Sequence, residues 1–321
     1  MKLGVFTALL QDRLLEDVLR LVASLGYEMI ELPAWRGGGH LDLDAVEADR
    51  GRSLRGVVAR HGLTISAISN GREGHLILGP HDWTVDRWAP VAEQAERIEY
   101  GIARLTQTGR VAAMLEVPVV TGFVGSPVGD KWYNYPATNE KAYEGAWELF
   151  AARLNPILDE FGRLGVRFGH EVHPTEIAYN LETAERAVVA LGNRPEYGFN
   201  FDPSHLVWQG IDPVVFVKRL GRRIIHVHAK DAEVQADEVG RSGVLSGGAW
   251  TRPDRGFRFR VPGWGDVNWR RVISALVAAG YDYALSFEHE DPVMSPEDGL
   301  EKAIEYLRPL LIKKPLAQAW W

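Results

Sequence analysis

The stretch WELFAARLNPILDEFGRLGVRFGHEVHP (147–174) contains the unit from which most of the chain is built. Its apolar residues recur at spacings of three and four, which predicts a helix with one stripe facing a sheet. Pro156 lies inside that stripe and is expected to kink the helix or to remove one of its hydrogen bonds. The glycine of LGVRF then ends the helix, and a β-rich run at 166–172 follows at once. The stretch therefore predicts a helix joined to a strand by a tight turn.

The same alternation of helical and β-rich segments recurs along the chain. Eight runs are predicted as strands: 2–7, 27–32, 63–69, 117–122, 166–172, 197–202, 223–229 and 283–289. Helices alternating with strands are typical of a parallel sheet, and a closed barrel removes both exposed edges. An open doubly wound sheet would carry a glycine fingerprint after its first strand, but VFTALLQD (5–12) has no glycine. The prediction is an α/β fold, a (β/α)8 barrel of the TIM type, with residues 1–321 as a single domain.

Three segments do not fit the repeat. They follow the third, fourth and seventh predicted strands, at 70–90, 123–136 and 231–264, and they are rich in glycine and tryptophan. Long loops after barrel strands form the mouth of the active site. We expect these loops to be its walls or lids.

Composition excludes several classes of function. The chain has 321 residues and a formal net charge of −7, so a nucleic-acid partner is not expected. It has no cysteine, which excludes disulfides, thiolate catalysis and cysteine-ligated zinc. No segment reaches the roughly 18 apolar residues of a membrane span, and the first residues lack the pattern of a secretory signal. The expectation is a cytoplasmic protein that acts on a small molecule and not at a membrane.

Carboxylates and imidazoles gather at the ends of the last four predicted strands. The motifs are HEVHP (170–174), FDPSH (201–205), HVHAKD (226–231) and FEHED (287–291). Polar groups at the carboxyl ends of barrel strands are typically catalytic, and neighbouring strand ends lie about 5 Å apart. So many anionic groups in one pocket would repel each other without a cation. Oxygen ligands with an imidazole suit one divalent metal, Mn²⁺ first, with Mg, Co or Zn as alternatives.

Strand parity selects among the histidines. Side chains two residues apart share a face, so Glu171 pairs with His173, and His226 pairs with His228. The more C-terminal member of each pair lies nearer the mouth. This favours His228 as a metal ligand. His226 is expected one layer deeper, either as a packed core residue or as a residue that contacts the metal ligands from behind.

The order and spacing of these four motifs resemble the xylose-isomerase-like TIM-barrel superfamily, the sugar phosphate isomerase/epimerase family. The resemblance covers nearly the whole chain and is strongest from 166 to 291. In the ketose epimerases of this group, four such positions hold one metal. The resemblance thus implies metal ligands at Glu171, Asp202, His228 and Glu288. It also implies that His205 contacts the substrate or the metal's water.

The function expected from this resemblance is isomerisation or epimerisation of a sugar through a metal-stabilised cis-enediolate. Glu171 and Glu288 would be the catalytic carboxylates, one on each face of the substrate. The alternative is a lyase that eliminates a group from a 3-keto-sugar, such as the barrel subunit of a C-glycoside deglycosidase with a small second subunit. An endonuclease of this superfamily would need a histidine after strand four, where TGF (121–123) stands. A non-catalytic sugar-binding subunit would have no reason to keep paired carboxylates.

Further residues are candidates for contacts with the sugar or keto-sugar. His173 either contacts substrate or is an outward loop residue. Lys230 either pairs with its neighbour Asp231 or clamps the substrate. Three tryptophans lie just past strand ends, where an aromatic face can stack on a sugar ring: Trp35, Trp132 and Trp208.

Some expectations concern the surroundings of the site. The acidic residues Glu290 and Asp291 are interpreted as surface charges of a loop. No phosphate-binding glycine motif is present, which favours an unphosphorylated substrate. By resemblance, barrels of this size form dimers or tetramers, so a homo-oligomer is expected.

Overall fold

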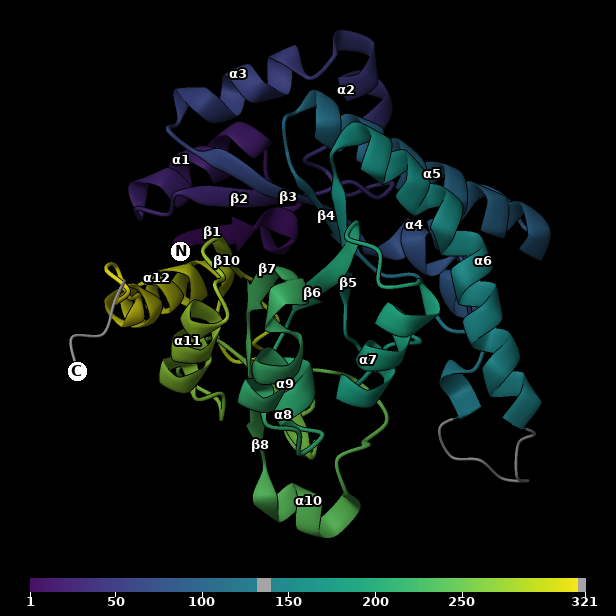
Figure 1. Cartoon of the computed structure of the whole chain (residues 1–321). Helices are drawn as coiled ribbons and strands as arrows, with labels where there is room; N and C mark the ends of the chain where they lie inside the picture. The colour runs from purple at the N-terminus through teal and green to yellow at the C-terminus, as the bar shows by residue number, and fades with distance from the viewer. Residues whose placement is uncertain (132–139, 317–321) are drawn as a thin grey trace.

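The computed structural model describes residues 1–131 and 140–316. Eight parallel strands close into one barrel in the order β1-β10-β7-β6-β5-β4-β3-β2 (Figure 1). Their bounds are Lys2–Phe6 (β1), Met29–Pro33 (β2), Thr64–Asn70 (β3), Val119–Gly122 (β4), Arg167–Glu171 (β5), Tyr197–Phe201 (β6), Ile224–Ala229 (β7) and Ala284–Phe287 (β10). The predicted α/β barrel is confirmed, and each predicted strand overlaps an observed one.

The helices between the strands form the outer ring (Figure 1). The longer ones are Leu15–Ser24 (α1), Leu43–Asp49 (α2), Arg52–Arg60 (α3), Gln94–Met114 (α5), Glu140–Leu164 (α6), Leu181–Ala190 (α7), Pro213–Leu220 (α9), Trp269–Ala278 (α11) and Pro296–Leu307 (α12). Short 3-10 helices lie at Thr7–Leu10, Trp83–Trp88, Gly129–Lys131, Gly221–Arg223 and Arg308–Leu310.

Helix α6 shows how the apolar stripe is used. Its residues Trp147, Phe150 and Phe161 are buried, and the helix continues through Pro156. Helices α5 and α6 lie side by side (Figure 1). Gly109 of α5 permits this approach, because a Cβ there would lie 2.2 Å from the Phe161 ring.

The long segments contain structure that the sequence pattern did not predict. Residues 70–90 include the short helix Gly71–His75 (α4) and the 3-10 helix Trp83–Trp88. Residues 231–264 include an antiparallel pair, Asp231–Val234 (β8) with Phe257–Arg260 (β9), and the helix Ala236–Ser242 (α10). A further short helix, Ser204–Val207 (α8), follows β6. Trp132 and the rest of 132–139, in the segment after β4, lie outside the described residues.

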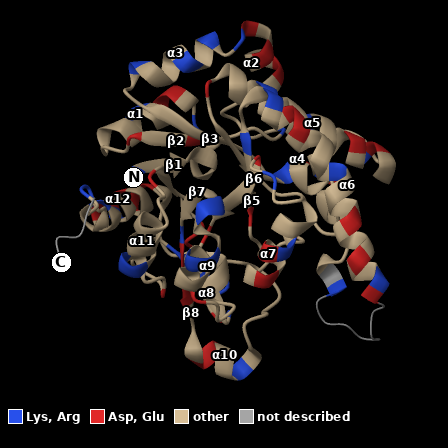
Figure 2. Cartoon of the chain, in the orientation of Figure 1, with Lys and Arg blue, Asp and Glu red and all other residues tan. Residues whose placement is uncertain are grey.

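The surface of the described part has mixed charge. In the view of Figure 2, Lys and Arg are interspersed with Asp and Glu along α5 and α6. These helices therefore present no continuous basic stripe of the kind that follows a phosphate backbone. No helix within residues 1–131 and 140–316 is both long and apolar enough to span a membrane.

Candidate active site

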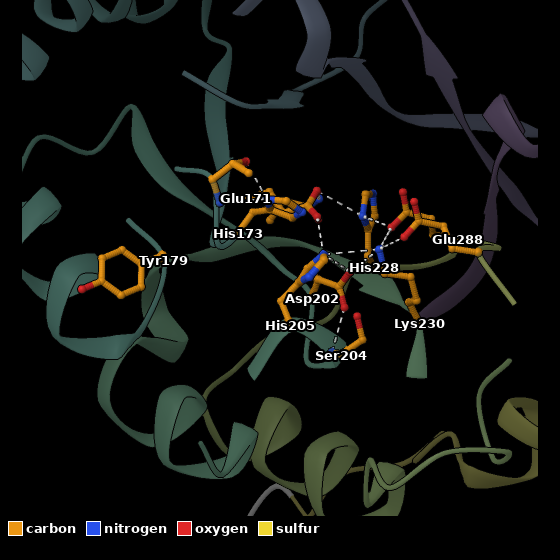
Figure 3. Close-up of polar contacts among 12 residues, drawn as sticks. Glu171, His173, Tyr179, Asp202, Ser204, His205, His228, Lys230 and Glu288 are labelled. Carbon is orange, nitrogen blue, oxygen red and sulfur yellow. Dashed lines mark hydrogen bonds and ion pairs between the residues drawn. The ribbon is translucent and has the colours of Figure 1, made fainter. Parts of the chain in front are cut away.

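Four side chains from four neighbouring strand ends converge at the barrel mouth (Figure 3). Glu171 ends β5, Asp202 follows β6, His228 lies in β7 and Glu288 follows β10. One possible ligand atom from each lies within 4.8 Å of the others. His228 Nδ1 is 3.3 Å from Glu171 Oε2 and 3.1 Å from Glu288 Oε2. The predicted set is thus brought together, with three carboxylates around one imidazole nitrogen.

Two buried atoms of this group form no hydrogen bond within residues 1–131 and 140–316. Asp202 Oδ1 accepts the backbone N–H of Ser204 at 2.8 Å, which leaves Oδ2 without a hydrogen bond. Lys230 Nζ is 3.0 Å from that Oδ2, without hydrogen-bonding geometry. His228 Nδ1 is also buried and forms no hydrogen bond with any described residue, although two carboxylate oxygens lie within 3.3 Å of it. Buried polar atoms are nearly always bonded, and exceptions point to an ion or water. Because both atoms face the same centre, the group fits a divalent cation.

A carboxylate that the sequence analysis missed orients His228. Glu31 of β2 is fully buried, and its Oε2 lies 3.0 Å from His228 Nε2. It also accepts hydrogen bonds from Thr121 Oγ1 at 2.6 Å and from Ser286 Oγ at 2.8 Å. When Nε2–H donates to this carboxylate, the lone pair of the imidazole is on Nδ1. Such carboxylate–histidine pairs typically stand behind metal ligands.

His226 lies one layer deeper, where strand parity predicts it. Its Nδ1 contacts Asn200 Oδ1 at 3.0 Å, and its Nε2 contacts Ser66 Oγ at 3.2 Å. Asn200 in turn donates its amide to Glu171 Oε2 at 3.0 Å. His226, Glu31 and His228 also lie close enough to form a second ligand group. Since both nitrogens of His226 are already bonded, we assign it to positioning Glu171 through Asn200.

Lys230 enters the site instead of pairing with its neighbour. Its Nζ donates to Glu288 Oε2 at 2.7 Å and to Glu290 Oε2 at 2.9 Å, and the side chain is buried. The predicted alternative of a Lys230–Asp231 ion pair is therefore wrong. Asp231 is turned away and accepts hydrogen bonds from the Trp269 indole and from three backbone N–H groups.

Two histidines, His205 and His173, lie beside the ligand group. His205 Nε2 is 3.4 Å from both Glu171 Oε1 and Asp202 Oδ2. The His173 ring lies 4.3 Å from the His205 ring. Burial, reinforced by the charge of His205, lowers the pKa of His173 to about 3. His173 is thus neutral at ordinary pH and can accept or donate a hydrogen bond.

Trp35 and Trp208, the candidate tryptophans in the described part of the chain, pack against other aromatic side chains. Trp208 stacks on Phe257 of β9 with centroids 4.4 Å apart, so one of its faces is covered. Trp35 contacts Phe6 edge-on at 5.9 Å, and Phe6 stacks on His228 at 5.5 Å. A single aromatic ring therefore separates Trp35 from the ligand group.

The acidic residues after Glu288 have different environments. The Glu290 side chain is 48% exposed but bound to Lys230. Asp291 is buried and accepts from Arg260 Nε at 2.9 Å. The surface-charge interpretation is wrong for Asp291, which ties β9 to the end of β10.

The electrostatics of the site follow from this crowding. Burial alone would raise the pKa of Glu171, but His228, His205 and Lys230 outweigh it and hold the pKa well below its ordinary range. Burial also opposes ionisation of Glu288, whose pKa falls to about 2 because of Lys230 and His228. Burial lowers the pKa of His228, but Glu31, Glu288 and Glu171 raise it well above its ordinary value. Glu171 and Glu288 are therefore charged at neutral pH, and His228 and Lys230 supply positive charge beside them.

Comparison with known proteins agrees with this architecture. The family model described as xylose isomerase-like TIM barrel matches residues 19–310. Over 331 residues, 96% of this chain and 98% of the relative, the chain is 28% identical to the uncharacterized protein YfiH of Bacillus subtilis. It is 26% identical to an inosose dehydratase of Geobacillus thermodenitrificans, over 51% of this chain and 55% of that protein.

Two solved structures share the fold. The IolI protein, whose structure contains a zinc atom, has a TM-score of 0.66 at 18% identity, over 97% of this chain and 98% of its own. The 3-keto-D-glucoside 4-epimerase YcjR of E. coli has a TM-score of 0.66 at 13% identity, over 96% of this chain and 99% of its own. At such identities the likeness concerns the fold alone.

Proposed function

Because the chain belongs to the xylose isomerase-like TIM-barrel family, we propose that it is a divalent-metal-dependent sugar isomerase or epimerase. Its reaction moves a proton at the carbon beside a ketone. One observation carries the proposal: the possible ligand atoms of Glu171, Asp202, His228 and Glu288 lie within 4.8 Å of one another. Two atoms of this group, Asp202 Oδ2 and His228 Nδ1, are also buried without a hydrogen bond in the part of the chain that the structure describes.

The four residues of the ligand group would hold the ion. When bound, a divalent cation supplies the positive charge that lets a C–H beside a carbonyl lose its proton. Three carboxylates and one imidazole suit Mn²⁺, which we propose as the native metal. Zn²⁺ is the competitor to test, since the similar IolI structure contains zinc. Mg²⁺ and Co²⁺ also suit these donors.

Glu171 and Glu288 are the proposed proton carriers. They come from β5 and β10, with β6 and β7 between them, so they approach the centre from two sides. One takes the proton from the substrate carbon, and the other can return it to the opposite face. Asn200 fixes Glu171 through Oε2, while Lys230 fixes Glu288 through Oε2. These contacts hold both carboxylates in place before substrate arrives.

Three further residues would bind substrate hydroxyls. Lys230 donates hydrogen bonds, His173 is neutral, and His205 Nδ1 is buried without a partner among the described residues. A sugar hydroxyl can both donate and accept, so it satisfies each of them. Trp35 and Trp208 form more distant walls.

The test replaces each proposed proton carrier. Glu171→Gln and Glu288→Gln keep the size of the side chain but cannot accept a proton. We expect each to lower turnover of a ketose substrate by about 10² to 10⁴, the usual value of general base catalysis. Glu290→Gln is the matched control, because Glu290 also binds Lys230 but lies outside the ligand group. Near wild-type turnover of Glu171→Gln or Glu288→Gln would show that the glutamate is not a proton carrier.

Solvent exchange separates the two carboxylates. In D₂O, a variant with one working base can exchange the substrate C–H for deuterium without converting the substrate. We expect exchange to exceed conversion in at least one of the two glutamine variants. Equal loss of exchange and conversion in both would argue against a two-base reaction.

A second candidate is elimination from a 3-keto-sugar, and a cavity favours it. The cavity has a volume of about 540 Å³ and is lined in part by Trp147, Pro174 and Trp208. Pro174 directly follows His173 in the sequence, and Trp208 comes three residues after His205. The cavity that they line therefore offers room for a leaving group beside the site. The partial similarity to an inosose dehydratase also supports a lyase. Release of aglycone from a 3-keto-glycoside, with no epimer formed, would identify this reaction.

Assembly depends on which reaction is correct. An isomerase or epimerase is proposed to act as a homo-oligomer on a sugar or keto-sugar. A deglycosidase would pair the barrel with a small second subunit. Measuring the mass of the purified protein in solution distinguishes the two.

A further inference from the structure

A second cavity lies on the β2–β3 side of the barrel mouth. Its volume is about 310 Å³. Its wall residues include three arginines, two tryptophans and one glutamate: Arg36, Arg72, Arg87, Trp35, Trp88 and Glu73. We call it the arginine cavity. Trp35 and Arg36 follow β2, whereas the others come from the segment after β3.

The arginines of this cavity lack counter-charges. Among the described residues, the guanidinium groups of Arg36, Arg72 and Arg87 form no ion pair and no hydrogen bond with a carboxylate. Arg72 is half-buried and lies over the Trp35 ring at 4.9 Å. Its burial and the neighbouring charge of Arg87 lower its pKa. An arginine nevertheless stays charged, so the cavity holds positive charge that the protein leaves uncompensated. Arg36 and Arg87 are exposed, so water solvates their charges when nothing is bound, whereas Arg72 is half-buried.

Glu73 does not neutralise these arginines, because its carboxylate is already occupied. It accepts hydrogen bonds from Arg104 Nε and Tyr100 OH at 3.0 Å each, and from Asn70 Nδ2 at 3.1 Å. The backbone N–H of Arg36 donates to it as well. Glu73 therefore fixes the wall of the cavity, and its charge is balanced by Arg104 from α5.

Two tryptophans of the cavity wall have indole N–H groups that no described residue accepts. The Nε1 atoms of Trp35 and Trp88 are buried without a hydrogen-bond partner in the described part of the chain. An indole N–H and a guanidinium can only donate. The arginines thus offer donors and positive charge to the cavity, and the Gln11 side chain in its wall adds an amide that can donate or accept. The ligand that complements the cavity is an anionic group with several oxygen acceptors, a carboxylate or a phosphate.

The arginine cavity is close to the ligand group. Its wall residue Trp35 contacts Phe6, and Phe6 stacks on His228. One aromatic layer therefore separates the anion-attracting side of the mouth from the carboxylate side. A small molecule bound at both sides has to extend past the edges of the Phe6 and Trp35 rings, and its anionic group then lies away from the carboxylates that repel it.

We propose that the arginine cavity binds the anionic end, carboxylate or phosphate, of a keto-sugar whose reacting carbon lies between Glu171 and Glu288. This inference rests on the proposed function for the position of the reacting carbon. The anion binding itself depends only on the cavity. A phosphate in this cavity would replace the expectation of an unphosphorylated substrate, which followed from the lack of a glycine-rich phosphate motif, whereas a carboxylate agrees with that expectation.

Binding is tested by isothermal titration calorimetry on the metal-free protein, so that no anion binds through the ion. The ligands are inorganic phosphate, a 2-keto-aldonate, a ketose phosphate and the neutral ketose with the same carbon number. The variants are R72Q/R87Q and, as a control for the loss of an arginine outside the cavity, Arg60→Gln on the exposed face of α3. Thermal melting of each variant checks that it is folded.

We expect the anionic sugars to bind wild-type protein at least tenfold more tightly than the neutral ketose. R72Q/R87Q should weaken binding of the anionic ligands by about 10- to 100-fold, the value of one or two charge-assisted hydrogen bonds. It should leave the neutral ketose unaffected, and Arg60→Gln should change nothing. Of the 2-keto-aldonate and the ketose phosphate, the ligand whose affinity falls more from wild type to R72Q/R87Q identifies the anionic group that the cavity binds.

Equal affinity of folded R72Q/R87Q and wild-type protein for every anionic ligand would overturn the inference. So would equal affinity of wild-type protein for neutral and anionic ketoses. These results leave the proposed function intact if Glu171→Gln still loses turnover. Conversely, full turnover of Glu171→Gln with anion binding lost in R72Q/R87Q would refute only the proton-carrier role.

Discussion

Replacing Glu31 by glutamine tests whether the buried carboxylate behind His228 sets metal affinity. Glu31 is fully buried and accepts hydrogen bonds from Thr121 and Ser286 in addition to its contact with His228 Nε2. Glutamine has the same length but no charge, and one of its two terminal atoms is a donor. That NH₂ group would face a hydroxyl or an imidazole N–H in place of a carboxylate oxygen. His228 then loses the partner that fixes its ring and its tautomer.

The size of the effect follows from this contact. Losing the outer partner of a ligating histidine typically weakens metal binding by about 10- to 100-fold, which is about 1.4 to 2.7 kcal/mol. The four residues of the ligand group are unchanged, so binding is weakened and not abolished. We therefore expect the Kd of Glu31→Gln for Mn²⁺ to rise by that factor, while the variant remains folded.

The assay is competition with a fluorescent chelator, and Glu176→Gln is the matched control. Glu176 is also a buried carboxylate between histidines, 2.8 Å from His75 Nδ1 and 3.0 Å from His170 Nε2. It is not one of the four ligand-group residues. Glu176→Gln should lower the free energy of unfolding but keep the metal Kd. An unchanged Kd in Glu31→Gln, or an equal rise in both variants, would refute the role given to Glu31.

Three further predictions concern metal and pH. Chelation should lower the melting temperature, because an ion present at 100 times its Kd stabilises the folded state by about 2.7 kcal/mol; differential scanning calorimetry checks this, and an unchanged melting temperature contradicts it. Asp202→Asn and His228→Ala should lose metal by elemental analysis, while His226→Ala keeps metal but unfolds more easily; the reverse pattern would show that the depth assignment in β7 is wrong. Burial lowers the pKa of His40 from 6.5, so below that pH the unfolded chain takes up a proton that the folded chain does not, and the free energy of unfolding falls. Between about pH 7.5 and 5.5, the free energy of unfolding measured in urea should fall less for His40→Gln than for wild type. The same dependence of this free energy on pH in both proteins would contradict the prediction.

The barrel could be predicted because its signals are local. A β-rich run and a glycine at the end of a helix each occupy only a few residues, and each recurs in most units. The antiparallel pair Asp231–Val234 and Phe257–Arg260 was missed because its strands have four residues each and pair across 22 intervening positions. Such short strands carry no periodicity that separates them from a loop.

The ligand group was also predictable, since its members sit in motifs at consecutive strand ends. Glu31 was not, because its partner His228 is 197 positions away and on a different side of the barrel. Its signal was the one carboxylate in the otherwise apolar run MIEL (29–32). A buried charge is retained only when it is paired, so that position demanded a partner. Strand parity alone could also have excluded the Lys230–Asp231 pair, since adjacent residues of an extended chain point to opposite faces.

The distribution of charge around the mouth gives the two proposals a common physical basis. The β5–β10 side gathers Glu171, Asp202 and Glu288 around one centre, while the arginine cavity lies on the β2–β3 side. Lys230 and His228 balance part of the negative charge on the first side, and Phe6 and Trp35 lie between the two sides. A cation on the first side and an anionic group on the second would balance the charge that remains on each. A substrate with a ketone at one end and an anion at the other could then bind in only one orientation, with its reacting carbon between the two glutamates.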